Sequence, residues 1–312
     1  MGTPDFAVPC LKILLDNPEV TNVVAVYTQP DRPAGRGLEL KAPPVKDLAL
    51  QYKVPVFQPE NINKENEPRK LADYMADVVV VVAYAQFLGK NILNIPRLGC
   101  VNVHGSLLPK YRGAAPIQYS ILNGEKEAGV TTMKLVEKMD AGPMLLRKAV
   151  PLNDEVTFGE LYESLSKVGA ELLLETMKGL KERTVEETVQ NEQEATYAKL
   201  ITKEMAKVDF QKPAKETHNL IRAFHPWPCA FTVTNKGKVK IHKSKVIPKH
   251  FGPSGDFKTG HVTFHNNMLL VKCVDDWLQL VVVQMEGKKQ ITGEQLIHGL
   301  QGENKEFKII EE

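Results

Sequence analysis

The segment from Asp77 to Ala83 constrains the fold most strongly, because Val78 to Val82 are five consecutive valines. A strand whose side chains are all branched and apolar has no face suited to water, so it must be buried on both sides. Such strands are typical of parallel sheets covered by helices on both faces. The sequence therefore predicts an α/β fold with a doubly wound, mainly parallel sheet and right-handed connections.

Strands and helices are predicted to alternate around this segment. Apolar runs predict strands, and apolar residues at helical spacing predict helices. The predicted strands are 23–28, 54–57, 77–83, 100–104, 130–136 and 144–150, and the predicted helices are 8–15, 45–52, 65–75, 116–122 and 157–180. Thr157 and Glu160 form a Thr-x-x-Glu capping box for the last helix. Ligands of such sheets bind beyond the carboxyl ends of the strands, where residues 84–88, Asn102, His104 and Asp140 should gather.

The amino end lacks an element that this fold needs. Gly2-Thr3-Pro4 is typical of a turn between a strand and a helix, yet only Met1 precedes it. Our hypothesis is that Met1 is an internal residue of the native protein and that the first, central strand is missing. Its loss would leave unpaired backbone groups and an open apolar slot. A stop codon directly upstream of Met1, with no apolar codons between, would contradict this hypothesis.

The last third of the chain predicts a second, small domain. Residues 181–194 are charged and almost free of apolar side chains, which indicates a linker. After His225-Pro226-Trp227-Pro228 come short strands separated by turn residues, as in a small β-barrel. We therefore expect a catalytic domain at 1–182, a linker at 183–203 and a barrel at 204–312.

Composition sets limits on the class of protein. The 312 residues are 43% apolar and 25% charged, typical of soluble globular proteins. No apolar run approaches the ~20 residues that span a membrane. Four widely spaced cysteines indicate single thiols in a reducing compartment, without disulfides or a zinc site. We expect a monomeric, cytoplasmic protein without a metal. A location in an organelle stays an alternative, because the amino end looks truncated.

Three polar residues suggest carbonyl chemistry. Asn102 and His104 are two apart, so on a strand their side chains share one face. An amide and an imidazole could both donate to an oxygen that becomes negative when a nucleophile adds to a carbonyl. Asp140 follows in a turn rich in Gly and Pro, and could orient the ring and favour its charged form. The alternative is a hydrogen-bonded structural pair without a catalytic role.

Two basic segments suggest an anionic partner. The loop 29–41 carries Arg32, Arg36 and Lys41 among prolines and glycines, and is either a surface insertion or functional. From Glu204 onward, 16 Lys and Arg outnumber 12 Asp and Glu. In a predicted strand nearby, Lys236, Lys238 and Lys240 share one face. This face is either a solvated edge that resists aggregation or a contact surface for a phosphate backbone.

The run Asn102-Val103-His104-Gly105-Ser106-Leu107-Leu108-Pro109, followed by Arg112-Gly113-Ala114-Ala115-Pro116, resembles the signature of the folate-dependent formyltransferases. The spacing to Asp140 is similar too, and the resemblance covers nearly the whole chain. It implies transfer of a formyl group from 10-formyltetrahydrofolate, an OB-like barrel, and no metal. It also implies that Asn102, His104 and Asp140 are catalytic and that Ser106, Leu107, Leu108 and Pro109 contact the folate.

The loop Thr28 to Lys41 makes the resemblance more specific. It is similar to an insertion in family members whose acceptor is the α-amine of methionine on initiator tRNA. This implies that Arg36, with Arg32 and Lys41, contacts the acceptor arm. Two alternatives stay open: a formyltransferase acting on a nucleotide-linked amino sugar, and a catalytically dead RNA-binding relative. A dinucleotide-dependent oxidoreductase is disfavoured, because no Gly-x-Gly-x-x-Gly turn follows a strand.

Overall fold

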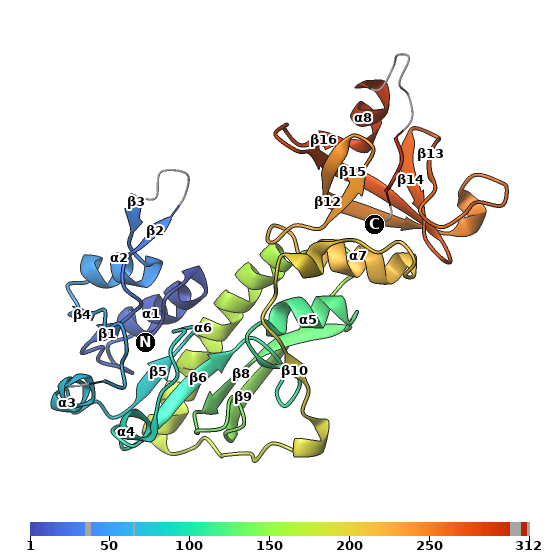
Figure 1. Cartoon of the computed structure of the whole chain (residues 1–312). Helices are drawn as coiled ribbons and strands as arrows, with labels where there is room; N and C mark the ends of the chain where they lie inside the picture. Colours follow the sequence, from blue (N-terminus) through green and yellow to red (C-terminus); the bar gives the residue numbers. More distant parts are fainter. Residues whose placement is uncertain (35–38, 65, 300–306, 311–312) are drawn as a thin grey trace. The chain divides into compact units, whose positions relative to one another are not determined.

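The computed structural model describes residues 1–34, 39–64, 66–299 and 307–310 (Figure 1). The chain divides into two compact units. The first consists of Met1–Pro116, Glu127–Val150 and Tyr162–Ala198, and the second of Ile117–Lys126, Pro151–Leu161 and Lys199–Glu312. Most of the predicted linker thus belongs to the first unit. The predicted limits 1–182, 183–203 and 204–312 differ from this division and stay a prediction about domain organisation.

The first unit contains the predicted, mainly parallel sheet. Strand β5 (Val79–Val81) pairs in parallel with β6 (Cys100–His104), and β1 (Val26–Tyr27) pairs in parallel with β4 (Val56–Phe57). Beyond β6, the order continues with β8 (Glu127–Lys134) and β9 (Met144–Pro151). Strand β8 runs antiparallel to β6. The predicted fold class is confirmed, with an antiparallel pairing at one end of the sheet.

Met1 and Gly2 lie between the two parallel pairs of strands. The Gly2 N–H donates to the Tyr27 carbonyl (3.0 Å), and the Val82 N–H donates to the Met1 carbonyl (2.9 Å). A cavity of about 660 Å³ adjoins these residues, and its lining includes apolar residues of β1, β5 and the first helix. The hypothesis that a central strand precedes Met1 stays a prediction.

The remaining elements of the first unit follow the predicted order. The helices are α1 (Val8–Leu15), α2 (Pro44–Gln51), α3 (Glu67–Asp73), α4 (Lys90–Leu93), and most of α6 (Phe158–Glu182). Two short hairpin strands, β2 (Arg32–Ala34) and β3 (Glu39–Lys41), flank the part of the loop that is not described. A parallel pair joins β7 (Arg112–Gly113) to β10 (Tyr197–Ala198), so the segment after α6 returns to the loop that follows β6.

The second unit is a curled antiparallel sheet with helices, as the OB-like barrel prediction requires (Figure 1). Its strand order is β11 (Phe231–Thr234), β12 (Gly237–Ile247), β15 (Trp277–Met285), β14 (Met268–Lys272) and β13 (Val262–His265), with β16 (Ile291–Thr292) on β15. The helices are α5 (Pro116–Leu122), α7 (Ala214–Ala223) and α8 (Gly293–Gly299). Val239, Ile241 and Leu280 are buried in its core.

The capping box at the start of α6 is confirmed. The Thr157 N–H donates to the Glu160 carboxylate (2.8 Å), and the Glu160 N–H donates to the Thr157 hydroxyl (3.4 Å). These reciprocal bonds satisfy two backbone donors that the first turn of a helix leaves without partners. They also hold the pKa of Glu160 below its usual value.

The four cysteines are free thiols and are buried. Burial raises the pKa of Cys10, Cys100 and Cys273 to about 12, so these thiols are unreactive near neutral pH. Among the helices of the described ranges, none combines the length and apolar character that crossing a membrane requires. Within the same ranges, no three His, Cys, Asp or Glu side chains gather in a way that could hold a metal ion.

Candidate active site

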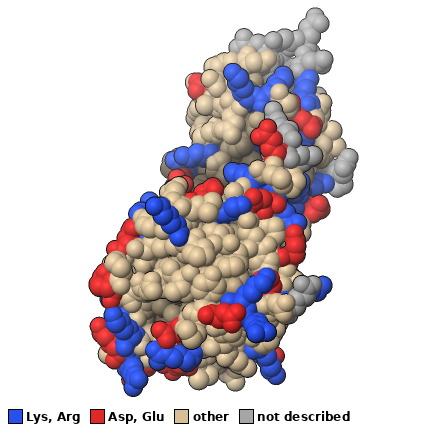
Figure 2. Space-filling model, turned by 90° about the vertical axis from the view of Figure 1, so that its left-hand side faces the viewer, with Lys and Arg blue, Asp and Glu red and all other residues tan. Residues whose placement is uncertain are grey.

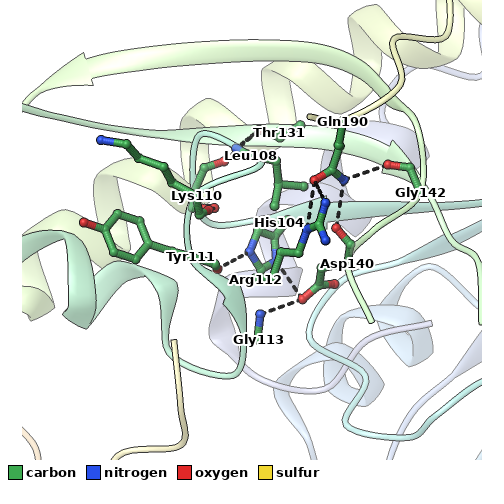
Figure 3. Close-up of polar contacts among 11 residues, drawn as sticks. His104, Leu108, Lys110, Tyr111, Arg112, Gly113, Thr131, Asp140, Gly142 and Gln190 are labelled. Atoms are coloured by element: carbon green, nitrogen blue, oxygen red, sulfur yellow. Dashed lines mark hydrogen bonds and ion pairs between the residues drawn. The ribbon is translucent and has the colours of Figure 1, made fainter. Parts of the chain in front are cut away.

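His104 is the last residue of β6 and is buried, with 6% of its side chain exposed. Its Nε2 lies 2.9 Å from the carbonyl oxygen of Tyr111, seven residues further along the chain (Figure 3). Because a carbonyl only accepts hydrogen bonds, Nε2 must carry a hydrogen. On the other side of the ring, Nδ1 lies 3.7 Å from Oδ2 of Asp140. The structure therefore brings His104 and Asp140 together, as predicted.

Asp140 lies in the turn between β8 and β9 and has a positive φ of 49°. Its Oδ2 accepts a hydrogen bond from the Gly113 N–H (2.8 Å), which holds the carboxylate beside the ring. The turn needs the glycine at 142, because a Cβ there would lie 1.8 Å from the Lys134 carbonyl oxygen. The Gly/Pro-rich sequence thus serves a close approach of two backbones that brings Asp140 toward β6.

The surroundings of the ring define its hydrogen bonding. Both neighbours, the Tyr111 carbonyl and the Asp140 carboxylate, are acceptors. A doubly protonated ring can donate on both sides, whereas a neutral ring with its hydrogen on Nε2 turns a lone pair toward the carboxylate. Asn102 lies two residues before His104 on β6, between Val81 of β5 and Met133 of β8. Strand alternation places its side chain on the same face as His104.

The predicted folate-contacting segment Ser106 to Pro109 forms a turn tied to β8. The Ser106 hydroxyl donates to the Lys110 carbonyl (2.6 Å) within the turn. Thr131 of β8 donates to the Ser106 carbonyl (2.7 Å) and accepts from the Leu108 N–H (3.1 Å). Leu107 packs over Gly129, where any Cβ would collide with it. Thr131 therefore shapes this turn, although nothing in the sequence motif pointed to it.

Arg112 forms hydrogen bonds with two residues after α6, buried Gln190 and exposed Glu192, which sequence reasoning missed. The Arg112 side chain is fully buried and donates to Oε1 of Gln190 and to the carboxylate of Glu192. Hydrogen bonds from Arg112 and Lys138 lower the pKa of Glu192 to about 2. Both partners lie in the segment predicted as a linker. Its high charge is typical of solvated chain, so pattern alone could not identify them.

Two of the three predicted tRNA-binding residues of the first unit, Arg32 and Lys41, lie on the surface. Arg32 forms an exposed ion pair with Glu60 (2.7 Å), Lys41 is exposed in β3, and Arg36 lies outside the described residues. Figure 2 shows one face of the molecule, on which Lys and Arg side chains lie among Asp and Glu side chains. With a net charge of only +2, contact with a polyanion would depend on local groups of basic residues.

The lysine strand of the second unit has the predicted two faces. Lys236 precedes β12, and Lys238 and Lys240 lie on it. All three are exposed, whereas Val239 and Ile241, which alternate with Lys238 and Lys240, are buried. The Lys238 ammonium lies 3.6 Å from the centre of the Phe231 ring. Strand β12 pairs with β11 on one side and β15 on the other. The lysines therefore do not protect an open sheet edge, which weakens that alternative.

Comparison with known proteins gives the class to which this fold and site belong. The profile of the Formyl transferase family matches residues 1–177, and the profile of the Formyl transferase C-terminal domain matches residues 200–301. The fold agrees with a solved structure of WlaRD, described as a sugar 3N-formyl transferase in the presence of dTDP and 5-N-formyl-THF. That likeness has a TM-score of 0.67 at 21% identity and covers 92% of this chain and 97% of WlaRD.

HypX from Aquifex aeolicus, in complex with tetrahydrofolic acid, is similar in fold at a TM-score of 0.58 and 15% identity. This likeness covers 93% of the present chain and 51% of HypX. Sequence relatives are much closer. A methionyl-tRNA formyltransferase of Ruminiclostridium cellulolyticum is 41% identical over 300 residues, covering 96% of this chain and 95% of the relative. That of Caldanaerobacter subterraneus is 44% identical over 292 residues, with 93% of each chain covered. The chain belongs to the methionyl-tRNA formyltransferase family, and the resemblance found in the sequence is confirmed.

Proposed function

We propose that this protein transfers a formyl group from 10-formyltetrahydrofolate to the α-amine of methionine on initiator tRNA, for translation initiation. The observation that carries this proposal is the 41–44% identity to methionyl-tRNA formyltransferases across both units of the chain. Two proteins of the same fold have folates named as their ligands, which supports a folate donor. The sugar-formylating protein is only 21% identical, so the tRNA acceptor is favoured over an amino sugar.

The proposed reaction forms one C–N bond and breaks another. The methionine amine attacks the formyl carbon, and the carbonyl oxygen becomes a tetrahedral oxyanion. Collapse of this intermediate breaks the bond to N10 of the folate, which takes up a proton, while the attacking amine loses one. The donor is proposed to lie against the turn of Ser106, Leu107, Leu108 and Pro109, beside the carboxyl end of β6.

Asn102 and His104 are the proposed donors to the oxyanion. Each such donor lowers the barrier by roughly 3 to 4 kcal/mol in comparable sites. In the structure, Nε2 of His104 donates to the Tyr111 carbonyl, so donation from this nitrogen to the oxyanion requires that bond to be exchanged. The proposed role of Asp140 is to hold the ring and to help accept the amine proton, directly or through water.

The partner surfaces and setting are part of the same proposal. We place the tRNA acceptor arm against Arg36, Arg32 and Lys41, and the tRNA backbone against Lys236, Lys238 and Lys240. Contacts of this kind are largely independent of base sequence and sensitive to salt. The protein is proposed to act in the cytoplasm, as a monomer and without a metal ion.

The test is transfer of labelled formyl from 10-formyltetrahydrofolate to methionyl initiator tRNA, with a dTDP-linked amino sugar as a parallel acceptor. We expect labelled tRNA, unlabelled sugar and a rate that falls as salt rises. Labelling of the sugar alone would move the function to the amino-sugar alternative. Labelling of neither acceptor by folded protein would favour a catalytically dead RNA-binding relative, provided that a tRNA-binding assay still shows a complex.

A further inference from the structure

The segment after α6 is bonded to both loops that form the candidate active site. On one side, the Arg112 N–H donates to the Thr196 carbonyl (2.8 Å) and the Ala114 N–H to the Ala198 carbonyl (2.9 Å). On the other side, Met144 and Thr188 exchange two backbone hydrogen bonds of 2.8 Å. Residues 188–198 thus connect the loop after His104 with the turn that carries Asp140.

Gln190 lies between these anchors and joins the two loops through its side chain. Its Oε1 accepts from Nε (3.0 Å) and Nη2 (2.8 Å) of Arg112. Its Nε2 donates to the carbonyls of Asp140 (2.8 Å) and Gly142 (2.7 Å) (Figure 3). An amide has two donor hydrogens and two acceptor lone pairs, so all its capacity is used. The amide cannot be rotated by 180°, because its NH₂ group would then face the N–H groups of Arg112 and its oxygen would face the two carbonyls.

The bonds to the Asp140 turn act on a strained backbone. Asp140 has a φ of 49°, in the left-handed region that residues with a Cβ rarely adopt. Such conformations persist where the surroundings hold them. Here the Asp140 carbonyl is held by Gln190 and its carboxylate by the Gly113 N–H. Gln190 is only 5% exposed, so water cannot easily replace it.

We propose that Gln190 is a positioning residue for formyl transfer, which sets the place of the Asp140 carboxylate relative to Nδ1 of His104. This inference rests on the proposed function. If the two hydrogen bonds from Nε2 of Gln190 were lost, the Asp140 turn would no longer be connected to Arg112. The Asp140 carboxylate would then move relative to the His104 ring. Arg112 keeps its ion pair with Glu192 (2.9 Å), so its buried guanidinium retains a partner.

The test compares Gln190→Glu with Gln193→Glu in the full chain. Gln190→Glu keeps an acceptor for Arg112 but turns an oxygen toward the carbonyls of Asp140 and Gly142. Gln193 is exposed three residues further on, so its substitution is a control with the same charge change. We expect kcat of Gln190→Glu to fall by about 10²-fold, because misplacement of a catalytic group by about 1 Å has this effect. The KM values for the folate donor and for the tRNA acceptor should change little. Lower pH should restore part of the kcat of Gln190→Glu, because the introduced carboxyl, once protonated, can donate to the carbonyl of Asp140 or of Gly142.

A second measurement separates this inference from the proposed function. Nitrogen NMR of the His104 ring is followed against pH in the wild type and in Gln190→Leu, which adds no charge. We expect a different titration curve in Gln190→Leu, even if the wild type formylates no tRNA and the proposed function fails. The inference is overturned if both Gln190 variants match the wild type in kcat and in the NMR titration of His104. It is also overturned if kcat falls only in proportion to the amount of folded protein, while the dependence of kcat on pH stays that of the wild type.

Discussion

His104 has a hydrogen-bond acceptor on each side of its ring. The Tyr111 carbonyl lies 2.9 Å from Nε2, and Oδ2 of Asp140 lies 3.7 Å from Nδ1. Because a carbonyl only accepts hydrogen bonds, it determines that Nε2 carries a hydrogen and that Nδ1 is the ring nitrogen facing Asp140. The chemistry of the ring thus depends on a backbone atom that no residue pattern reveals.

Asp140→Asn should show whether the charge beside the ring matters for formyl transfer. The amide oxygen can still accept from the Gly113 N–H, so the turn should keep its shape. The charge facing Nδ1 is lost, and we expect turnover to fall by roughly 10²-fold or more. Single-turnover transfer to charged tRNA measures this. Glu137→Gln, in the same turn and exposed, is the control and should keep full activity; equal rates for both variants would contradict a role for Asp140.

His104→Ala and Asn102→Ala should each abolish most turnover while the protein stays folded. Both residues are proposed to donate to the oxyanion, and each donor contributes roughly 3 to 4 kcal/mol to the barrier. Initial rates of labelled formyl transfer, together with circular dichroism, test this. Retained activity of the His104 variant would remove the residue from the mechanism.

At the scale of elements, local sequence rules account for boundaries that packing does not disturb. Helix α6 starts where Thr157 and Glu160 predict it, because the capping bonds are made by neighbours in sequence. Strand β12 continues to Ile247, well beyond the lysines by which the sequence predicts it. Pairing with β15 holds this extension, although the register shifts between Ile241 and Ser244, and that pairing depends on distant residues.

Thr157→Ala should destabilise the protein by about 1 kcal/mol, the usual cost of losing a helix N-cap. The backbone N–H and the carboxylate of Glu160 would both lose the Thr157 hydroxyl as a partner, whereas the N–H of residue 157 could still donate to that carboxylate. Urea unfolding measures the effect, and Thr157→Ser should keep most of the stability. If alanine and serine variants unfold at the same urea concentration as the wild type, the cap does not stabilise the helix.

Glu192 should make the stability of the first unit depend on acid. Its pKa is about 2 in the folded protein against a usual 4.5, so the native state favours the charged form. The resulting stabilisation is present above pH 4.5 and is lost as the pH falls toward 2. We expect the difference in unfolding free energy between wild type and Glu192→Gln to shrink over this range. A difference independent of pH would contradict the pairing with Arg112 and Lys138.

For the whole molecule, the small net charge means that tRNA binding depends on where the lysines lie. The triple variant of Lys236, Lys238 and Lys240 to Gln should bind tRNA more weakly and with a lower salt dependence. Each phosphate contact contributes about 0.9 to the slope of log K against log salt for a duplex. Filter binding at several salt concentrations measures the slope. A control triple, Lys12, Lys70 and Lys90 to Gln, removes the same charge from lysines already paired with carboxylates; equal slopes for both triples would refute the surface.

The class of the fold, the elements around Val78 to Val82 and the presence of His104 and Asp140 in one site could all be predicted from the residues alone. The first two follow from apolar periodicity, a local property of the chain, and the third from a family resemblance that extends from the motif at 102–116 to Asp140. That the segment after α6 joins the site, where Gln190 and buried Arg112 connect two loops, became apparent only from the folded chain. A polar residue that becomes buried must find hydrogen-bond partners, and Gln190 finds its partners in distant parts of the chain. These hydrogen bonds join residues about 50 to 80 positions apart in the sequence, so local patterns do not reveal them.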